Sequence, residues 1–289
     1  MKRCMDDYEQ AICEHWRLEN LGDAILGVLH SMGIDIEVLT PADLAPIDAF
    51  HSRGLEATKE LASHVGVRSG WNVLDVGSGL GGTARYLAVE HSCHVTGLDI
   101  TDTYCEVATM LSKRLRLNTC TVFQQGNALT MPFPNASFDL VWTEHTQMNI
   151  PDKAKFYGEI SRVLKLGGHF AFQDIFQGPN GEMYFPVPWA DEPSISYLIA
   201  PNDLKILLES IGFRVLYWRD TSLKALVSAQ QRKKQVEACE LPPFGTHLLM
   251  RTDAKLKLKN QARNLEEGRI VLIQAVLEKA SYNKEFLHL

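Results

Sequence analysis

The chain has 289 residues, of which 45% are hydrophobic and 22% are charged, and its formal net charge is −6. This length allows one large α/β domain with additions, and the negative charge argues against non-specific binding to nucleic acid or to an anionic membrane. No apolar stretch approaches the ~20 residues that span a bilayer, and six cysteines without CxxC spacing favour reduced thiols in a cytoplasmic protein with no metal site.

The N-terminal part, residues 1–50, is predicted to be a helical segment. It contains the apolar run 24–29 and then Thr40-Pro41, where Thr40 is expected to cap a helix that has proline in its first turn. Acids rather than an apolar run follow the first five residues, so we expect no secretory signal. A further helix is predicted over residues 54–65, ending at Gly66.

From residue 72 onward, predicted strands and helices alternate. The expected strands are 72–76, 94–99, 119–125, 138–143, 169–175, 213–218 and 269–277, and the expected helices between them are 84–90, 103–115, 153–164 and 204–211. This alternation predicts a doubly wound, seven-stranded, mostly parallel sheet of the Rossmann-like kind. Ligands of such sheets bind outside the carboxyl ends of the strands.

Two segments exceed a minimal sheet. Residues 176–202, inside the predicted core 51–220, hold five of the twelve prolines and begin where the fifth strand ends. We interpret them as a lid, with a rigid packed connection as the alternative. Residues 221–268 form a polar helical insertion, read as a cap or an oligomer contact, before the last strand and tail at 269–289. Two short basic runs in it, 232–234 and 255–259, are interpreted as solvated faces.

A glycine-rich turn lies between the first strand and its helix. Residues 73–76 are an apolar strand carrying Asp75, and glycines follow at positions 77, 79, 81 and 82. Glycine lets the chain bend sharply and allows a ligand to approach the backbone. The same residues satisfy GxGxxG, the dinucleotide fingerprint, so an NAD-dependent oxidoreductase is an alternative. Asp75 disfavours it, because a carboxylate there would repel a pyrophosphate but would suit a positively charged ligand.

Five motifs then occur in order along the chain. They are Leu74-Asp-Val-Gly-Ser-Gly79, Gly97-Leu-Asp99, Gly126-Asn-Ala128, Phe138-Asp-Leu-Val-Trp142 and Val163-Leu-Lys-Leu-Gly-Gly168. Together they resemble the class I S-adenosylmethionine-dependent methyltransferases over about residues 50–220. Residues 50–54 and 142–152 are similar to small-molecule methyltransferases of the ubiquinone/menaquinone and sarcosine/dimethylglycine types.

The resemblance implies S-adenosyl-L-methionine as cofactor, S-adenosyl-L-homocysteine as product, and roles for individual residues. Asp99 would bind both ribose hydroxyls, and Arg53 or His51 could reach the methionine carboxylate. Asn127 stands where the family has Asp, so its amide oxygen would accept from the adenine amino group without charge assistance. The expected cofactor-binding residues are Asp75, Gly77, Ser78, Gly79, Leu80, Asp99, Ile100, Asn127, Ala128, Thr143 and Arg53.

The implied reaction is in-line displacement at the sulfonium methyl, in which the protein aligns the acceptor and excludes water. A base is needed where the acceptor arrives protonated, and the expected catalytic residues are His145, Glu144 and His51. The lid aromatics could surround an amine by cation–π contact or stack on a quinol or phenol. The expected substrate-contacting residues are Gln147, Met148, Tyr184, Trp189 and Tyr197.

Two further functions were considered. Residues 241–244, Leu-Pro-Pro-Phe, are similar to the signature of amino-methylating nucleic-acid methyltransferases, but they lack the leading Asp or Asn and follow the wrong strand. A cofactor-binding scaffold without catalysis also fits the glycine turn. The sequence therefore predicts a methyltransferase acting on a small molecule, with the acceptor, the methylated atom and a homo-oligomeric state left open.

Overall fold

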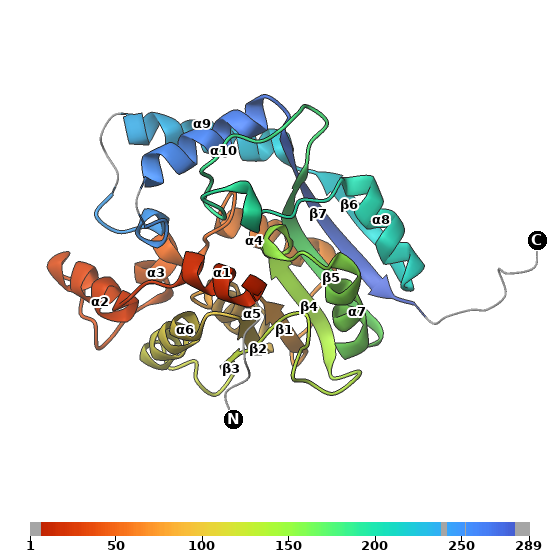
Figure 1. Cartoon of the computed structure of the whole chain (residues 1–289). Helices are drawn as coiled ribbons and strands as arrows, with labels where there is room; N and C mark the ends of the chain where they lie inside the picture. The colour runs from red at the N-terminus through yellow and green to blue at the C-terminus, as the bar shows by residue number, and fades with distance from the viewer. Residues whose placement is uncertain (1–6, 238–241, 252, 281–289) are drawn as a thin grey trace, which may run out of the picture.

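A computed structural model describes residues 7–237, 242–251 and 253–280; for residues 233–237 it describes the backbone. Within these residues seven strands form one sheet in the order β3-β2-β1-β4-β5-β7-β6 (Figure 1). Only β7 runs antiparallel to its neighbours among these strands. The strands are β1 (Asn72–Val76), β2 (His94–Asp99), β3 (Thr121–Gln125), β4 (Phe138–Glu144), β5 (Leu164–Gln177), β6 (Phe213–Asp220) and β7 (Ile270–Lys279). The predicted fold class is confirmed.

Helices cover both faces of the sheet, as a parallel sheet requires. Along β1 the buried side chains alternate, so that Val73 packs with one cluster while Leu74 and Val76 pack with the other. The helices of the sheet are α4 (Leu55–Val65), α5 (Gly82–His91), α6 (Asp102–Arg114), α7 (Lys153–Val163) and α8 (Pro201–Ser210).

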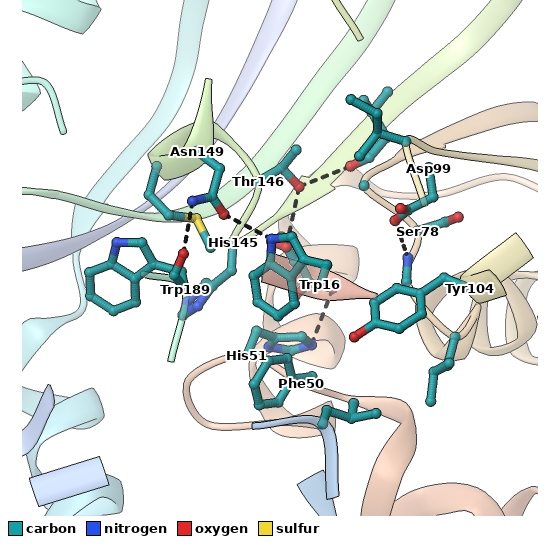
Figure 2. Close-up of a pocket in the computed structure, with 18 of the residues that line it drawn as sticks. Trp16, Phe50, His51, Ser78, Asp99, Tyr104, His145, Thr146, Asn149 and Trp189 are labelled. Atoms are coloured by element: carbon teal, nitrogen blue, oxygen red, sulfur yellow. Dashed lines mark hydrogen bonds and ion pairs between the residues drawn. The ribbon is translucent and has the colours of Figure 1, made fainter. Parts of the chain in front are cut away.

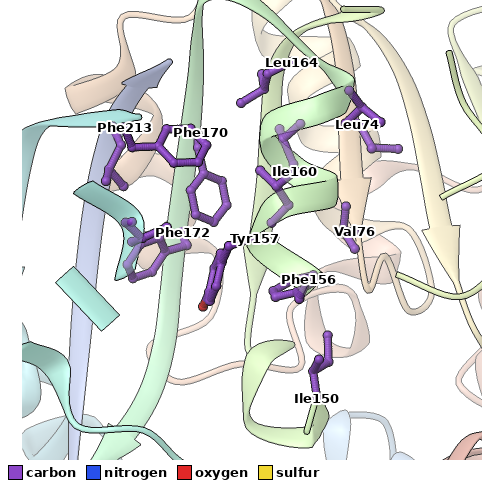
Figure 3. Packing of buried hydrophobic residues seen from close by; sticks show 14 of the residues in the cluster. Leu74, Val76, Ile150, Phe156, Tyr157, Ile160, Leu164, Phe170, Phe172 and Phe213 are labelled. Carbon is purple, nitrogen blue, oxygen red and sulfur yellow. The ribbon is translucent and has the colours of Figure 1, made fainter. Parts of the chain in front are cut away.

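The larger cluster lies between α7 and the central strands. Phe156, Tyr157 and Ile160 of α7 are less than 2% exposed, and Tyr157 lies beside Phe170 and Phe172 of β5 (Figure 3). Asp152 caps α7 by accepting a hydrogen bond from the Lys155 N–H at 2.9 Å. This packing fixes the ends of β4 and β5, where the predicted catalytic residues lie.

Strand β5 is longer than expected. The sequence predicts a strand over residues 169–175, but β5 already begins at Leu164 and includes Gly167 and Gly168. The register of β5 against β4 shifts between the pairs Phe138–Leu164 and Leu140–His169, so the two glycines lie in a bulge that keeps the strand paired.

The N-terminal helical segment comprises α1 (Asp7–Trp16), α2 (Leu21–Ser31) and α3 (Pro41–Asp48). Thr40 and Asp43 form the expected cap at the start of α3, because the Thr40 side chain accepts from the Asp43 N–H and the Asp43 carboxylate accepts from the Thr40 N–H. The end of α3 lies against the start of α5 and carries Asp48, which pairs with Arg85 at 2.5 Å.

This contact makes Gly82 a sensitive position. A Cβ added there would lie 1.9 Å from the backbone oxygen of Asp48, so Gly82→Ala forces α3 away from α5. We expect a loss of about 3 kcal/mol of unfolding free energy, near the upper end of the cost of overpacking. Thermal denaturation checks this, with Gly27→Ala as the matched control: Gly27 lies inside α2 with no heavy atom within 4 Å of its added Cβ. Equal melting temperatures for the two variants would contradict the close contact.

Residues 178–200 and the insertion lie together. The insertion consists of α9 (Ser222–Glu237), a short turn at Thr246–Leu249 and α10 (Ala254–Glu266), and Figure 1 shows α9 and α10 side by side next to the loop. Asn264 of α10 exchanges two hydrogen bonds of 2.9 Å with the backbone of Tyr184, and Asn260 donates to Pro186 O at 2.9 Å. The loop is thus tied to α10; its role as a moving lid stays a prediction. Among the described residues, no helix has both the length and the apolar character needed to cross a membrane.

Candidate active site

The carboxyl ends of β1, β2 and β4 open into a cavity of about 170 Å³. A single buried water needs roughly 10–15 Å³ on the same measure, so the cavity has room for an organic ligand. Figure 2 shows Asp99 and Ser78 on one side of the Trp16 ring and His145 and Trp189 on the other. The cavity therefore has an end at β2 and an end at β4.

The glycine turn forms the floor of the β2 end. The N–H groups of Gly77 and Ser78 donate to Leu98 O at 2.7 and 3.2 Å, which ties the turn to the end of β2. Gly77 has φ of 74°, and a Cβ there would lie 2.4 Å from Thr146 Oγ1, so this position requires glycine on both counts. Asp99 accepts from the Gly79 N–H and the Thr101 N–H, one on each carboxylate oxygen, both at 2.9 Å.

Four carboxylates line this one cavity: Asp48, which pairs with Arg85, and Asp75, Asp99 and Glu144, which have no arginine or lysine partner among the described residues. Burial raises the pKa of Asp75 well above its ordinary value, and the neighbouring charges of Glu144 and Asp99 raise it further. Burial likewise raises the pKa of Asp99, against the lowering effect of its backbone hydrogen bonds. A bound cation would reverse these costs, because an opposite charge favours the ionised carboxylates.

These residues fit S-adenosylmethionine, which carries a sulfonium and an ammonium group. Asp75 Oδ2 and Ser78 Oγ are buried and have no hydrogen-bond partner among the described residues, although both residues line the cavity. A ligand with hydrogen-bond donors would satisfy both. The pyrophosphate of a dinucleotide would instead approach three carboxylates, so the NAD alternative is disfavoured by the cavity as well as by the sequence.

The expected adenine end is covered by α1. Ile100, Asn127 and Ala128 line the cavity as predicted. The Asn127 amide oxygen accepts from the Leu129 N–H at 2.7 Å, and its NH₂ group donates to the carboxylate of Glu9 on α1. The hydrogen bond from Leu129 uses one lone pair of the amide oxygen, which leaves one lone pair for an adenine amino group. The binding of adenine by Asn127 stays a prediction.

His51 and Glu144 form a hydrogen-bonded pair at the β4 end. His51 Nε2 lies 3.4 Å from Glu144 Oε2 and 3.3 Å from Thr58 Oγ1. Glu144 also accepts the Thr58 hydroxyl at 3.1 Å and the Thr83 hydroxyl at 2.8 Å. Because the Thr58 proton points to Glu144, His51 Nε2 must be the donor in its contacts. The neutral ring of His51 therefore carries its lone pair on Nδ1, which is buried with no hydrogen-bond partner among the described residues.

His145 occupies a different role. Its Nε2 accepts the Ser52 N–H at 3.4 Å, and its backbone has φ of 52°. Burial lowers the pKa of His145 well below its usual value, and the charges of His51 and Arg232 lower it further. A neutral ring whose Nε2 accepts a hydrogen bond carries its proton on Nδ1, so His145 is a donor rather than a base. Among the two histidines, the geometry favours His51 as the proton acceptor.

Several predicted site residues lie outside the cavity lining. Thr143 is buried within the β4–β5 pairing, and the Gln147 side chain donates to Ile175 O at 2.5 Å. Arg53 pairs with Glu60 at 2.5 Å and does not line the cavity. In each case a contact inside the fold competes with the ligand role. Gly77, Ser78, Gly79, Leu80, Met148 and Trp189 do line the cavity, and their roles stay predictions.

Of the aromatic residues predicted in the lid, some line the cavity and others are held by contacts inside the fold. The Tyr184 ring already contacts two cations of the chain itself, since Arg263 and Arg269 lie 3.6 and 4.3 Å from the ring centroid. Tyr197 donates its hydroxyl to Ser194 O at 2.7 Å and packs edge-on against Tyr8. Neither lines the cavity, so the expected aromatic cage does not include them; of the predicted aromatics, Trp189 does line it.

The interpretation of the basic runs as solvated faces is wrong for two residues. Lys257 is 2% exposed and pairs with Asp191 at 2.8 Å. Arg232 is half-buried and lines the cavity. Both lie on helices of the insertion, whose inward faces the sequence did not reveal because charged and apolar residues are mixed along them.

Other lining residues were also missed. Tyr8, Ile12 and Trp16 of α1 lie at a spacing of four residues, which places them on one helical face, and this spacing was the available signal. Asp174 on β5 accepts the Thr146 and Gln147 N–H groups, both at 2.9 Å, and burial raises its pKa to about 6. It thereby holds the turn after β4 that carries His145.

Comparison with known proteins agrees with this site. A family profile described as "Methyltransferase domain" matches residues 74–172. A sarcosine/dimethylglycine N-methyltransferase of Halorhodospira halochloris is 30% identical over 189 residues, covering 65% of this chain and 67% of that protein. A sterol 24-C-methyltransferase of Neurospora crassa is 31% identical over 183 residues, covering 61% of this chain and 48% of that protein. The chain thus spans two thirds of the first relative and about half of the second.

Solved structures show the same fold. The phosphoethanolamine N-methyltransferase 2 of Haemonchus contortus superposes at 16% identity in two structures. The complex with phosphomonomethylethanolamine and S-adenosylhomocysteine has a TM-score of 0.73, and the complex with S-adenosyl-L-methionine has a TM-score of 0.72. The alignment covers 96% of this chain and 61% of that one. Fold, cavity and relatives together define a methyltransferase with a Rossmann-like sheet. The chain belongs to the S-adenosylmethionine-dependent methyltransferases that act on small molecules.

Proposed function

We propose that the chain methylates the nitrogen of a small amine, of the glycine, sarcosine or dimethylglycine kind, with His51 as the general base. The observation that carries this proposal is the buried Nδ1 of His51, a residue of the cavity wall. This nitrogen has no hydrogen-bond partner among the described residues, while Nε2 of the same ring contacts Glu144 and Thr58. An ammonium acceptor must lose a proton before it can attack, whereas a base is not needed for an acceptor that arrives with a free lone pair.

When bound, S-adenosylmethionine would supply a methyl group carried on its positively charged sulfur, and loss of that methyl group leaves a neutral thioether. Asp75, Ser78 and Asp99 would hold it at the β2 end of the cavity. His51 Nδ1 takes the proton of the ammonium acceptor, and the freed nitrogen lone pair forms the new N–C bond as the S–C bond breaks. Glu144 is a positioning residue: it fixes the tautomer of His51 and stabilises the charged ring.

The walls of the cavity support an amine over a bulky neutral acceptor. Trp16, Phe50, Tyr104 and Trp189 line it, and aromatic faces attract an alkylated ammonium by cation–π contact. A quinol or phenol would stack on the same rings, and His51 could accept its hydroxyl proton. The amine is favoured because Asp75, Asp99 and Glu144 give the lining a negative charge.

Labelled S-adenosylmethionine tests the proposal directly. The purified chain is incubated with glycine, sarcosine, dimethylglycine, a catechol and a hydroquinone, and the products are identified by mass spectrometry. We expect label on nitrogen, with a parallel reaction lacking acceptor as the control. Label on phenolic oxygen alone would overturn the amine assignment. A rise in melting temperature with NADH but not with S-adenosylhomocysteine would overturn methyl transfer itself.

The proposal includes a reducing, cytoplasmic location and no partner beyond the small-molecule acceptor, with a homo-oligomer left open. The reducing location is supported by the free thiols of Cys13, Cys93, Cys105 and Cys120. Cell fractionation and size-exclusion chromatography with light scattering test the two points.

A further inference from the structure

A small side pocket adjoins the main cavity. Its volume is about 20 Å³, against the roughly 10–15 Å³ that one water needs, so it can take only the small end of a larger molecule. Ser52, Arg232 and Gln261 line both spaces. The side pocket therefore opens into the main cavity next to His51, the residue that precedes Ser52.

The first cation of this pocket is Arg232 of α9, and the described residues include no counter-ion for it. Among the residues that the structure describes, none makes a hydrogen bond or ion pair with its guanidinium, although the side chain is half-buried. Burial lowers the pKa of Arg232 from its usual value, which is the sign of a desolvated, uncompensated charge. A buried charge without a partner is costly in a folded protein, so an unpaired arginine on a cavity wall indicates an anionic ligand.

The second cation, Arg53, is only partly satisfied. Its Nη2 pairs with Glu60 at 2.5 Å, while its Nη1 is buried and has no partner within the described part of the chain. Arg53 also has φ of 71°, a left-handed conformation that is uncommon for any residue other than glycine. Such strain concentrates at functional sites, where the surrounding structure holds a side chain in place.

The acids near this pocket do not neutralise it. Glu60 is shared between Arg53 and Lys224, each at 2.5 Å, and it does not line the pocket. The remaining polar walls, Ser52, Ser228 and Gln261, can all donate hydrogen bonds, and Gln261 Nε2 already points to Ser52 Oγ at 3.4 Å. Two guanidinium groups and these donors make a site for an oxyanion.

We infer that this side pocket binds a carboxylate of the methyl acceptor, so that the substrate class is a small acceptor bearing a carboxylate. The size of the pocket favours a carboxylate over a larger oxyanion. The walls of the side pocket come from α9, α10 and the turn at residues 52–53. The unpartnered groups that suit the cofactor lie elsewhere, on the glycine turn and at the end of β1. The carboxylate in the side pocket is therefore assigned to the acceptor and not to the cofactor. The inference rests on the proposed methyl transfer and names the substrate class of the same site.

Matched acid and amide acceptors test it. The chain is assayed with labelled S-adenosylmethionine against N,N-dimethylglycine and its amide, and against 4-hydroxybenzoate and 4-hydroxybenzamide. We expect kcat/KM to be at least about tenfold higher for an acid than for its amide, and to fall about 10- to 100-fold for the acid in Arg232→Gln, the range for a lost hydrogen bond to a charged group. Arg219→Gln, the same change at an exposed position outside both pockets, should leave the rates unchanged.

Binding measurements separate this inference from the proposed function. With the chain saturated by S-adenosylhomocysteine, calorimetry should detect the acid of a pair and not its amide, and Arg232→Gln should abolish that difference while leaving the affinity for S-adenosylhomocysteine unchanged. Methylation or binding of amides as readily as acids would overturn the inference and leave methyl transfer intact. Weaker S-adenosylhomocysteine binding in Arg232→Gln would assign the pocket to the cofactor carboxylate and overturn it too. Failure to bind S-adenosylhomocysteine at all would reject the proposed function.

Discussion

Replacing Asp99 by alanine should lower the affinity for S-adenosylhomocysteine at least about 100-fold. Each oxygen of the Asp99 carboxylate already accepts one backbone N–H, at 2.9 Å, so the plane of the carboxylate is fixed before any ligand arrives. Each oxygen keeps further lone pairs toward the cavity, enough to accept both hydroxyls of a ribose. Two hydrogen bonds to a charged group, at roughly 1.5–3 kcal/mol each, account for a loss of this size.

Calorimetric titration with S-adenosylhomocysteine measures the effect. Asp99→Asn is the informative partner, since it keeps one accepting oxygen and should show an intermediate loss. Asp203→Ala, at an exposed position of α8, is the control for removing one negative charge. Melting temperatures are measured for every variant, because the Gly79 and Thr101 N–H groups lose their acceptor in Asp99→Ala. An unchanged affinity in a folded Asp99→Ala variant would refute the role of this residue in cofactor binding.

The sheet could be predicted from sequence because its signals are local. Short runs such as 72–76 and 94–99 are rich in apolar residues, and both strands begin and end where expected. Where an element depends on its neighbours, the sequence was less informative. The fifth strand is predicted to begin at residue 169, yet β5 begins five residues earlier, at Leu164, which pairs with Phe138 of β4. Tertiary pairing overrides local propensity there.

The same distinction separates the two ends of the cavity. The β2 end is built from one contiguous turn and the residue that ends the next strand, so a motif of about 25 residues contains it. The β4 end joins Thr58, Glu144 and Arg232, which lie on three elements far apart in the chain. No local pattern marks Arg232 as inward-facing, and the ion pair that takes Arg53 away from the expected role depends on Glu60 in the next helix.

The cap formed by α1 illustrates why such contacts escape a sequence reading. The side chains at positions 8, 12 and 16 share one face, but their partners follow from where the chain returns after residue 100. Trp16 Nε1 donates to the Asn149 amide oxygen at 3.3 Å, and Asn149 in turn donates to Trp189 O at 2.9 Å. Three segments that are remote in sequence therefore meet in one wall of the cavity.

Replacing His51 by glutamine should lower kcat for an amine acceptor by about 10²–10⁴, the range for loss of a positioned general base. The physical reason is the divided environment of its ring: Nε2 is committed to Glu144 and Thr58, so Nδ1 can take a proton from the acceptor. Glutamine retains hydrogen-bonding groups but has no group that ionises near neutral pH, so cofactor affinity should be preserved while turnover falls. Turnover of the variant should recover in part as the pH is raised, because the acceptor then loses its proton to solvent.

Two further variants show whether the effect belongs to the pair. Glu144→Gln should reduce kcat less than His51→Gln, and the double variant should be no slower than His51→Gln alone, because Glu144 acts through His51. His30→Gln, at an exposed position of α2, is the control for the substitution itself. Steady-state kinetics across pH, with S-adenosylhomocysteine affinity measured in parallel, decides the matter. If His145→Gln abolished turnover and His51→Gln did not, the base would be His145, and the hydrogen bond from Ser52 to its Nε2 would have to break during the reaction.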